Sequence, residues 1–294
     1  MFRGSMVALI TPFREGKVDY ESLEQLIEWH IAEGTDAIVP CGTTGESATL
    51  SHDEHKDVIA FVVKKVKGRV PVIAGTGSNS TREAIELAQV AKDVGADAHL
   101  SITPYYNKPT QEGLYLHFKA IHDAVNLPMI LYNVPGRTAV SIAPETMGRL
   151  SELDHVIGVK EATGDLKYAA EMMEKVRSGF LLISGDDFTA YALLAMGGVG
   201  AISVTANILP HQSHEMFASF FQGEREKAQK LFFEMLPFHR MMFLETNPIP
   251  VKAAAYFMGL IPTLEYRLPL CPLSQANEKK LKDFLREKQF LRRE

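Results

Sequence analysis

The stretch HVIGVKEATG, residues 155–164, is a short run of Val and Ile that ends at a lysine, Lys160. β-branched residues in a run of this length, followed closely by a glycine, are typical of a buried strand and its turn. Burying an unpaired ammonium group is costly, so such a lysine normally finds a partner or shifts its pKa. The sequence around Lys160 has to explain why a charged residue stands there.

Eight runs of this kind recur along the first two-thirds of the 294-residue chain. They are MVALI (6–10), DAIVPC (36–41), VPVIAG (70–75), AHLSIT (98–103), MILYN (129–133), VIGVK (156–160), LLISG (181–185) and GAISV (200–204). Helical periodicity separates them: Leu23, Leu26 and Ile27 follow an i, i+3, i+4 spacing, and Gly34 supplies a stop signal. Eight alternating βα units without a change in composition predict an α/β protein with a closed (β/α)8 barrel.

The strand signals stop after Val204, and the remaining chain is rich in Phe, Met, Leu, Glu and Lys at helical spacing. Two segments interrupt the helical pattern, ETNPIPVK (245–252) and YRLPLCPLS (266–274). We therefore expect a catalytic barrel domain over residues 1–206 and a C-terminal helical region over residues 207–294, packed on the barrel. The final EKKLKDFLREKQFLRRE, residues 278–294, is predicted to form an amphipathic helix.

The composition favours a small-molecule partner. A formal net charge of -5 and a pI near 6.1 give no global basic surface for nucleic acid or anionic lipid. No run approaches the roughly 20 apolar residues that a membrane span needs. Cys41 and Cys271 lie far apart without metal-ligand spacing, which indicates reduced thiols in a cytoplasmic protein.

The chemistry-bearing residues follow the predicted strands, and barrel enzymes act at those strand ends. A lysine among apolar neighbours favours its neutral amine, the form that attacks a carbonyl to make a Schiff base. Alternation places Lys160 on the same side as Gly158, which would leave space beneath it. Tyr132 ends the preceding run, so we expect it beside Lys160, where a phenol can pass protons. Alternatively, Lys160 extends to solvent or pairs with Glu161.

Three further sets of residues are ambiguous by themselves. In GTTGES (42–47), the amides and the hydroxyls of Thr43 and Thr44 suit a carboxylate or oxyanion, although such a segment is often only a turn. Arg137 suits a second carboxylate or a surface salt bridge. His52 and His55 are predicted at the start of a helix, where solvated side chains are the default, an effector pocket the sharper option and a metal site the least favoured.

Several motifs in order strongly resemble the dihydrodipicolinate synthase family, from Phe2 to about Pro272. They are GTTGES, TPYYNKPTQEGLY, YNVPGRT, GVKEATG, LLISGDD and ETNPIPVKAA. The resemblance implies a class I aldolase-type condensation of pyruvate with L-aspartate 4-semialdehyde, a step toward diaminopimelate and lysine. It also implies that no metal or organic cofactor is needed, because the lysine itself is the electron sink.

The resemblance assigns roles residue by residue. Lys160 would form the Schiff base, and Tyr132, Thr44 and Tyr106 would relay protons, with Tyr106 reaching across a dimer interface. The amides of Thr43 and Thr44 would hold the pyruvate carboxylate, and Arg137 the carboxylate of the semialdehyde. Further pocket positions match Gly185 and Ile202.

The resemblance further implies a homotetramer built as a dimer of dimers and feedback inhibition by L-lysine. The residues that match the effector site of lysine-inhibited members are Ser47, Ala48, His52, His55, Asn79, Glu83 and Tyr105.

Two other functions compete with this one. N-acetylneuraminate lyase and keto-deoxy sugar acid aldolases share the barrel, the lysine and the Gly/Thr loop, but sugar lyases tend to lack an arginine at the position of Arg137. A catalytically silent barrel that senses lysine or acts as a scaffold is the second alternative. The intact set of Lys160, Tyr132, Thr44 and Tyr106 argues against it.

Overall fold

The computed structural model describes residues 2–293 and divides the chain into two compact units. One unit comprises the residues up to Gly4 together with Pro71–Ile202. The other comprises Ser5–Val70 together with the residues from Ser203 onward. The predicted domain boundary between residues 206 and 207 stays a prediction.

The first unit is built on a parallel sheet in which neighbouring strands follow the order β10-β9-β8-β7-β6-β5. These strands are β5 (Ile73–Gly75), β6 (Ala98–Ile102), β7 (Met129–Asn133), β8 (Val156–Glu161), β9 (Leu181–Ser184) and β10 (Gly200–Ser203, whose last residue belongs to the second unit). Each coincides with a predicted run. The runs are rich in β-branched and apolar residues because both faces of such a sheet are covered.

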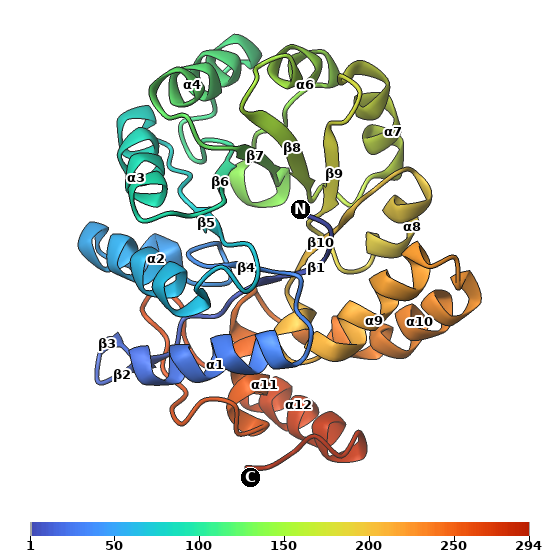
Figure 1. Ribbon diagram of the computed structural model, residues 1–294. Helices are drawn as coiled ribbons and strands as arrows, with labels where there is room; N and C mark the ends of the chain where they lie inside the picture. The colour runs from blue at the N-terminus through green and yellow to red at the C-terminus, as the bar shows by residue number, and fades with distance from the viewer. Residues whose placement is uncertain (1, 294) are drawn as a thin grey trace. The chain divides into compact units, whose positions relative to one another are not determined.

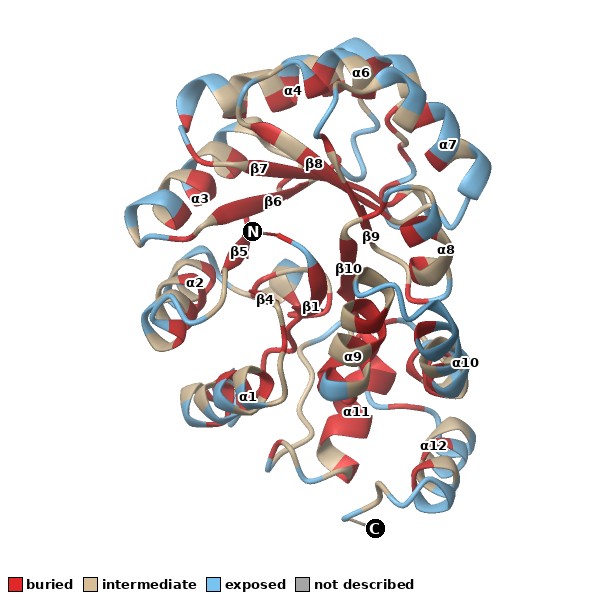
Figure 2. Ribbon diagram, turned by 45° about the vertical axis from the view of Figure 1, so that its right-hand side comes forward, coloured by how far each residue is buried: buried red, intermediate tan, exposed pale blue. Residues whose placement is uncertain are grey.

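Helices connect the strands of the first unit and cover one side of the sheet (Figure 1). They are α3 (Thr81–Asp93), α4 (Gln111–Ala124), α6 (Pro144–Ser151), α7 (Leu166–Lys175) and α8 (Ala190–Ala195). The short helix α5 (Pro135–Thr138) directly follows β7. In Figure 2 the strands β6 to β9 are largely buried, whereas α3, α4, α6 and α7 also carry exposed residues. This is the pattern of amphipathic helices that pack one face on a sheet.

The second unit contains the strands β1 (Gly4–Ala8, whose first residue belongs to the first unit), β2 (Phe13–Arg14), β3 (Lys17–Val18) and β4 (Ala37–Val39). Its helices are α1 (Tyr20–Ala32), η1 (Ser47–Thr49), α2 (His52–Val66), η2 (Thr205–Asn207), α9 (Pro210–Phe221), α10 (Arg225–Met242), α11 (Ile249–Phe257) and α12 (Gln275–Glu287). β1 pairs with β4 in parallel, and β2 and β3 form a short hairpin.

The C-terminal helices are packed parts of the second unit rather than an independent tail. Phe238 of α10 contacts Phe284 of α12 edge-on, with ring centroids 4.9 Å apart, and Phe290 just beyond α12 at 5.5 Å. Edge-to-face pairs of this kind add about 0.5–1.5 kcal/mol each beyond the area they bury. Leu281 and Leu285 of α12 are fully buried, as expected for the apolar face of an amphipathic helix.

The structure corrects the predicted limits of the first two strands. β1 ends at Ala8, and the amide of Ile10 donates to the side-chain oxygen of Asn207 instead of to a strand. β4 ends at Val39, because Cys41 adopts a left-handed backbone with φ of 55°, which no strand can include.

The predicted helix break over residues 245–252 is half wrong. α11 begins at Ile249, so Ile249–Lys252 is helical. Pro250 is compatible with this because a proline in the first turn lacks only an N–H that has no partner within the helix. Among residues 2–293, no helix combines the length and the apolar character that crossing a bilayer requires.

Candidate active site

The centre of the candidate site in the first unit is Lys160 of β8, whose side chain is buried. Strand register places it directly opposite Tyr132 of β7, so the predicted neighbourhood of these two residues is confirmed. The Lys160 Nζ atom lies 4.3 Å from the centroid of the Tyr132 ring. Burial lowers the pKa of Lys160 to about 7; Asp187 opposes this shift and Arg137 adds to it. Burial therefore favours the neutral amine at this position.

A glycine makes room for this lysine, but it is not the predicted one. A Cβ atom at Gly185, just after β9, would lie 2.9 Å from both Cε and Cγ of Lys160. A Cβ atom at Gly158 would instead lie 2.6 Å from the backbone oxygen of Leu181. Gly185 therefore accommodates the lysine side chain, whereas Gly158 allows β8 and β9 to approach. Ile202 of β10 is buried.

The opposite side of the same strand ends carries a buried polar network. Asn133 and Glu161 follow Tyr132 and Lys160 directly, so alternation turns them to the other face of the sheet. The Asn133 amide nitrogen donates to the Glu161 carboxylate at 3.2 Å and to the Tyr168 hydroxyl at 3.1 Å. Burial raises the pKa of Glu161. The network ties the ends of β7 and β8 together in the register that pairs Tyr132 with Lys160.

The same network holds the segment that carries Arg137. This residue lies in α5, directly after β7. The Asn133 side-chain oxygen accepts a bond from the Ile142 amide at 3.1 Å, and the Tyr168 hydroxyl donates to the Ile142 carbonyl at 2.6 Å. The segment starts at the end of β7, and these two bonds hold its far end at Ile142.

Tyr106 lies on the surface of the first unit and is 90% exposed. Its φ of 73° is a left-handed conformation that costs a residue of its size free energy. The neighbouring Tyr105 is also exposed, and its carbonyl accepts a bond from the Asn79 side chain at 3.2 Å. Glu83, the third predicted effector residue in this unit, accepts a bond from the Ser78 hydroxyl at 2.8 Å.

The Gly/Thr-rich loop lies in the second unit between β4 and η1. The amides of Gly45 and Glu46 donate to the carbonyls of Gly42 and Thr43 at 3.1 Å, which closes a tight turn. Within residues 2–293 the amides of Thr43 and Thr44 have no hydrogen-bond acceptor. Two adjacent amides without an acceptor suit an anionic group such as a carboxylate.

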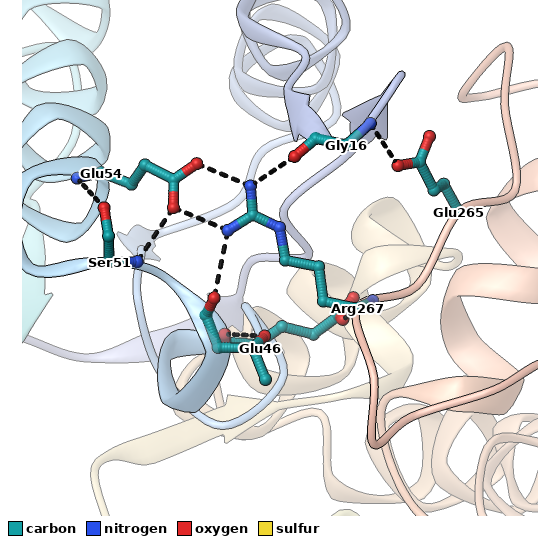
Figure 3. Close-up of polar contacts among 7 residues, drawn as sticks. Gly16, Glu46, Ser51, Glu54, Glu265 and Arg267 are labelled. Carbon is teal, nitrogen blue, oxygen red and sulfur yellow. Dashed lines mark hydrogen bonds and ion pairs between the residues drawn. The ribbon is translucent and has the colours of Figure 1, made fainter.

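Glu46 fixes the end of this loop. Its carboxylate forms a 2.5 Å ion pair with Lys252 of α11, and both side chains are completely buried. It also accepts a bond from the Arg267 amide at 3.4 Å. Figure 3 shows the Arg267 guanidinium between the Glu54 carboxylate, at 2.6 and 2.7 Å, and the Gly16 carbonyl, at 2.8 Å. The hydrogen bonds from Arg267 lower the pKa of Glu54.

The remaining predicted effector residues are close in sequence to Glu46. Ser47 and Ala48 form η1, and His52 and His55 lie in the first turn of α2 as predicted. His52 is exposed, but His55 is buried, so the default of two solvated histidines is wrong for His55. The residues that the structure describes contain no group of three or more His, Cys, Asp or Glu side chains arranged to hold a metal ion.

Several residues around these groups were not assigned to a site from the sequence. In the first unit they are Asn133, Asp187 and Glu161, the last named only as an alternative partner of Lys160; in the second unit they are Glu46, Asn247, Lys252 and Arg267. A signal existed for Lys252, because it is the one charged residue of the apolar helix IPVKAAAYF. No comparable signal pointed to Asn133 or Arg267, since their carboxylate partners Glu161 and Glu54 are distant in the sequence.

Known proteins match this chain over nearly its whole length. The profile of the dihydrodipicolinate synthetase family matches residues 1–288. The 4-hydroxy-tetrahydrodipicolinate synthase of Nitratidesulfovibrio vulgaris strain DP4 is 57% identical over 285 residues, which are 97% of each chain. The enzyme of the same description from Thermodesulfovibrio yellowstonii is 56% identical over 97% of this chain and 98% of the relative.

Solved structures also match the fold of this chain over nearly its whole length. The dihydrodipicolinate synthase of Aquifex aeolicus is similar with a TM-score of 0.96 and 46% identity over 99% of both chains. The chloride-inhibited enzyme of Acinetobacter baumannii, complexed with pyruvate, has a TM-score of 0.95 and 49% identity over 99% of this chain and all of that one. The enzyme of Cyanidioschyzon merolae with lysine bound has a TM-score of 0.94 and 38% identity over 99% of each. The predicted fold class, a (β/α)8 barrel with a C-terminal helical extension, is confirmed.

Proposed function

The chain belongs to the dihydrodipicolinate synthetase family, as its motifs predicted, and on this premise we propose that it condenses pyruvate with L-aspartate 4-semialdehyde. The product of this lyase-type reaction is 4-hydroxy-tetrahydrodipicolinate, an intermediate on the way to diaminopimelate and lysine. The observation that carries the proposal is the buried amine of Lys160, whose pKa of about 7 supplies a neutral nucleophile.

The proposed reaction begins when the Lys160 amine attacks the ketone carbon of pyruvate and water leaves, which forms an iminium ion. The positive nitrogen lowers the cost of removing a proton from the methyl group, so an enamine forms. The enamine carbon then bonds to the aldehyde carbon of the second substrate, which leaves the product as an iminium ion on Lys160. The amino group that came from the semialdehyde attacks the iminium carbon, closes the ring and releases the Lys160 amine. We assign the proton transfers to Tyr132, Thr44 and Tyr106. The 4.3 Å approach of Lys160 Nζ to the Tyr132 ring supports the first of these assignments.

The two carboxylates of the substrates need separate partners. We assign the pyruvate carboxylate to the amides of Thr43 and Thr44, which have no acceptor among the described residues. We assign the semialdehyde carboxylate to Arg137, because a guanidinium group binds carboxylates bidentately. Gly185 and Ile202 line the pocket in this proposal, and the space that Gly185 leaves for Lys160 supports its part.

The test of the proposed function is pyruvate consumption with three aldehydes offered separately: aspartate semialdehyde, N-acetylmannosamine and glyceraldehyde. We expect turnover with aspartate semialdehyde only. Turnover with a sugar aldehyde instead would retain the Schiff-base chemistry but contradict the substrate and the role given to Arg137.

We further propose that the protein is a homotetramer, a dimer of dimers, in which Tyr106 serves the neighbouring subunit. The 90% exposure of Tyr106 supports this, since a relay residue needs a surrounding that excludes water. A mixture of Tyr106→Phe and Lys160→Ala variants is expected to regain activity through hybrid dimers. If subunit exchange is verified and no activity returns, the shared site is wrong.

L-Lysine is the proposed feedback inhibitor. The hydrogen bond of Asn79 to the Tyr105 carbonyl supports the effector site, because it links one predicted ligand to the residue beside Tyr106. In this proposal Glu83 binds the side-chain ammonium group of lysine. Millimolar L-lysine is expected to lower the rate, whereas D-lysine serves as the matched control. An unchanged rate with L-lysine would refute the effector site.

A further inference from the structure

We propose that Asn247 and Lys252, from the segment NPIPVK, are positioning residues for the loop that carries Thr43 and Thr44. This inference rests on the proposed function, which assigns the pyruvate carboxylate and a proton transfer to that loop. All four residues belong to the second unit of the structure. Asn247 sets the direction of the Thr44 hydroxyl, and Lys252 fixes the backbone of the loop through Glu46.

In the hydrogen bond between Asn247 and Thr44, the donor and the acceptor can be assigned. The Asn247 amide nitrogen lies 3.0 Å from the Thr44 Oγ atom, and both residues are buried. An amide nitrogen only donates, so the Thr44 oxygen has to accept. The hydroxyl proton of Thr44 is therefore directed away from Asn247 and stays available to a following acceptor. A proton relay needs this orientation, and a hydroxyl that rotates freely does not maintain it.

Lys252 acts on the loop through Glu46, which directly follows Gly45. Glu46 has a left-handed φ of 55°, so the chain bends sharply where the turn ends. The 2.5 Å ion pair with Lys252 holds the Glu46 side chain in this position. Lys252 in turn lies over the ring of Phe13, with Nζ 4.1 Å from the centroid. The end of the loop is thus anchored to α11 and to the β2-β3 hairpin.

Other contacts leave the loop little freedom. The Thr11 hydroxyl donates to the Gly45 carbonyl at 2.7 Å. A Cβ atom at Gly45 would lie 3.0 Å from the Leu9 carbonyl and 3.2 Å from the Cys41 amide. The loop is therefore clamped beside Thr43 and Thr44, while the amides of those two residues keep no acceptor among the described residues.

Stability alone is a weak reason for the Glu46–Lys252 pair. Removing two charges from water is expensive, and well-packed apolar residues often replace a buried ion pair without loss of stability. The pair has a specific geometric effect, however, because it ends on the residue that closes the turn. We infer that it is present to position the loop.

The first test replaces Asn247 by Ala. The Thr44 hydroxyl then loses its donor and can rotate, so we expect kcat to fall by about 10-fold or more, while the KM for pyruvate changes by less than about 2-fold. Asn247→Ser, which retains a short donor, is expected to recover part of the lost kcat. Equal kcat for wild type and Asn247→Ala would overturn the role of Asn247.

The second test is the double variant Glu46→Gln with Lys252→Met, which removes both charges together and so avoids an unpaired buried charge. With the end of the loop released, the amides of Thr43 and Thr44 are displaced, and we expect the KM for pyruvate to rise by about 10-fold. The pyruvate concentration that half-saturates borohydride trapping on Lys160 is expected to rise equally. An unchanged half-saturation would overturn the role of Lys252.

The matched control is Leu281→Ala in α12, a fully buried position whose truncation destabilises the fold through a cavity. Although Leu281→Ala is expected to lower the melting temperature at least as much as the double variant, it is expected to leave the KM and the half-saturation unchanged. If it shifts both like the double variant, the effect is general destabilisation and the inference fails. If wild type itself traps no pyruvate, the proposed function fails instead, so the two failures are distinguishable.

Discussion

The two units of the molecule each bury one lysine over an aromatic ring, and the two lysines differ in their partners. In the first unit, Lys160 Nζ lies 4.3 Å from the Tyr132 centroid, and in the second, Lys252 Nζ lies 4.1 Å from the Phe13 centroid. Lys252 has a carboxylate at 2.5 Å, that of Glu46. Within its own unit, Lys160 forms no ion pair with any described residue.

A buried lysine can be a structural cation or a nucleophile, depending on its partner. Burial lowers both pKa values, that of Lys160 to about 7 and that of Lys252 to about 8 with Glu46 opposing the shift. The Glu46 carboxylate stabilises the ammonium form of Lys252. At Lys160 burial favours the neutral amine, which is what nucleophilic attack requires. The carboxylate partner therefore distinguishes the structural cation, Lys252, from the proposed nucleophile, Lys160.

The largest expected effect comes from Lys160→Met, which keeps the length of the side chain and removes the amine. We expect kcat/KM to fall by about 10³-fold or more, because the covalent intermediate cannot form. The melting temperature should not fall, since no ion pair is lost. Steady-state kinetics and thermal unfolding measure the two effects, and a variant that retains substantial activity would break the assignment of Lys160.

Lys252→Met, unlike Lys160→Met, is expected to lower the stability of the fold. It leaves the Glu46 carboxylate buried without its cation, and breaking a buried pair in this way costs about 3–5 kcal/mol of unfolding free energy. Adding Glu46→Gln should restore most of this stability. Urea unfolding of the three variants measures both. If the single variant is as stable as wild type, Lys252 has no structural role and the contrast between the lysines disappears.

The pH dependence sharpens the comparison for Lys160. Its pKa falls from 10.5 to about 7 on folding, so the unfolded chain binds more protons between these values. Unfolding free energy therefore gains a contribution that rises with pH across this window. Lys160→Met lacks the contribution, so its stability advantage over wild type should be complete below about pH 7 and shrink as the pH rises toward 10.5. An advantage independent of pH would contradict the lowered pKa.

The activity should follow the same titration. Schiff-base formation requires the neutral amine, so its rate is expected to rise with pH through about 7 and then level off. Stopped-flow measurement of pyruvate binding, followed by trapping, provides this profile. A profile that is flat around neutral pH would show that another group controls the step.

A smaller effect is expected from Asn133→Ala, which leaves Glu161 and the Ile142 amide without the partner that holds them. Loss of a buried hydrogen-bond partner costs about 1–3 kcal/mol of stability. Because Arg137 lies in the segment that Asn133 fixes, the KM for aspartate semialdehyde should rise more than the KM for pyruvate. Equal changes in both KM values would indicate a general effect on the fold.

The smallest effect is expected at an exposed lysine, Lys227, whose ion pair with Glu215 lies at the surface. Lys227→Met should change neither activity nor melting temperature measurably, because surface pairs contribute little. A clear loss in this variant would undermine the distinction drawn between buried and exposed lysines.

The sequence predicted the features that depend on local patterns of residues, namely the strands and the neighbouring positions of Tyr132 and Lys160. The strands β1, β4 and β5 to β10 each lie within or beside a predicted run, because period and composition determine a buried strand; the two-residue strands β2 and β3 were not predicted. The neighbourhood of Tyr132 and Lys160 was also predictable, since both end runs that are adjacent in the order of βα units. The pattern did not reveal that Gly185, rather than Gly158, accommodates the Lys160 side chain, because that contact depends on how β8 and β9 are placed against each other.

Contacts between segments that are distant in the sequence could not be predicted from local sequence patterns. Glu46 and Lys252 are separated by 206 positions, and nothing in either segment alone indicates the other. The segment NPIPVK was recognised as a motif but was interpreted as a break, although its second half is the first turn of α11. Its two contacts with the Gly/Thr-rich loop became visible only in the folded chain.

Borohydride reduction of the protein in the presence of pyruvate, followed by mass spectrometry of the peptides, identifies the nucleophile. We predict one stable adduct, on the peptide that contains Lys160, and an unmodified Lys252. An adduct on Lys252, or no adduct on Lys160, would contradict the claim that an unpaired buried lysine is the nucleophile.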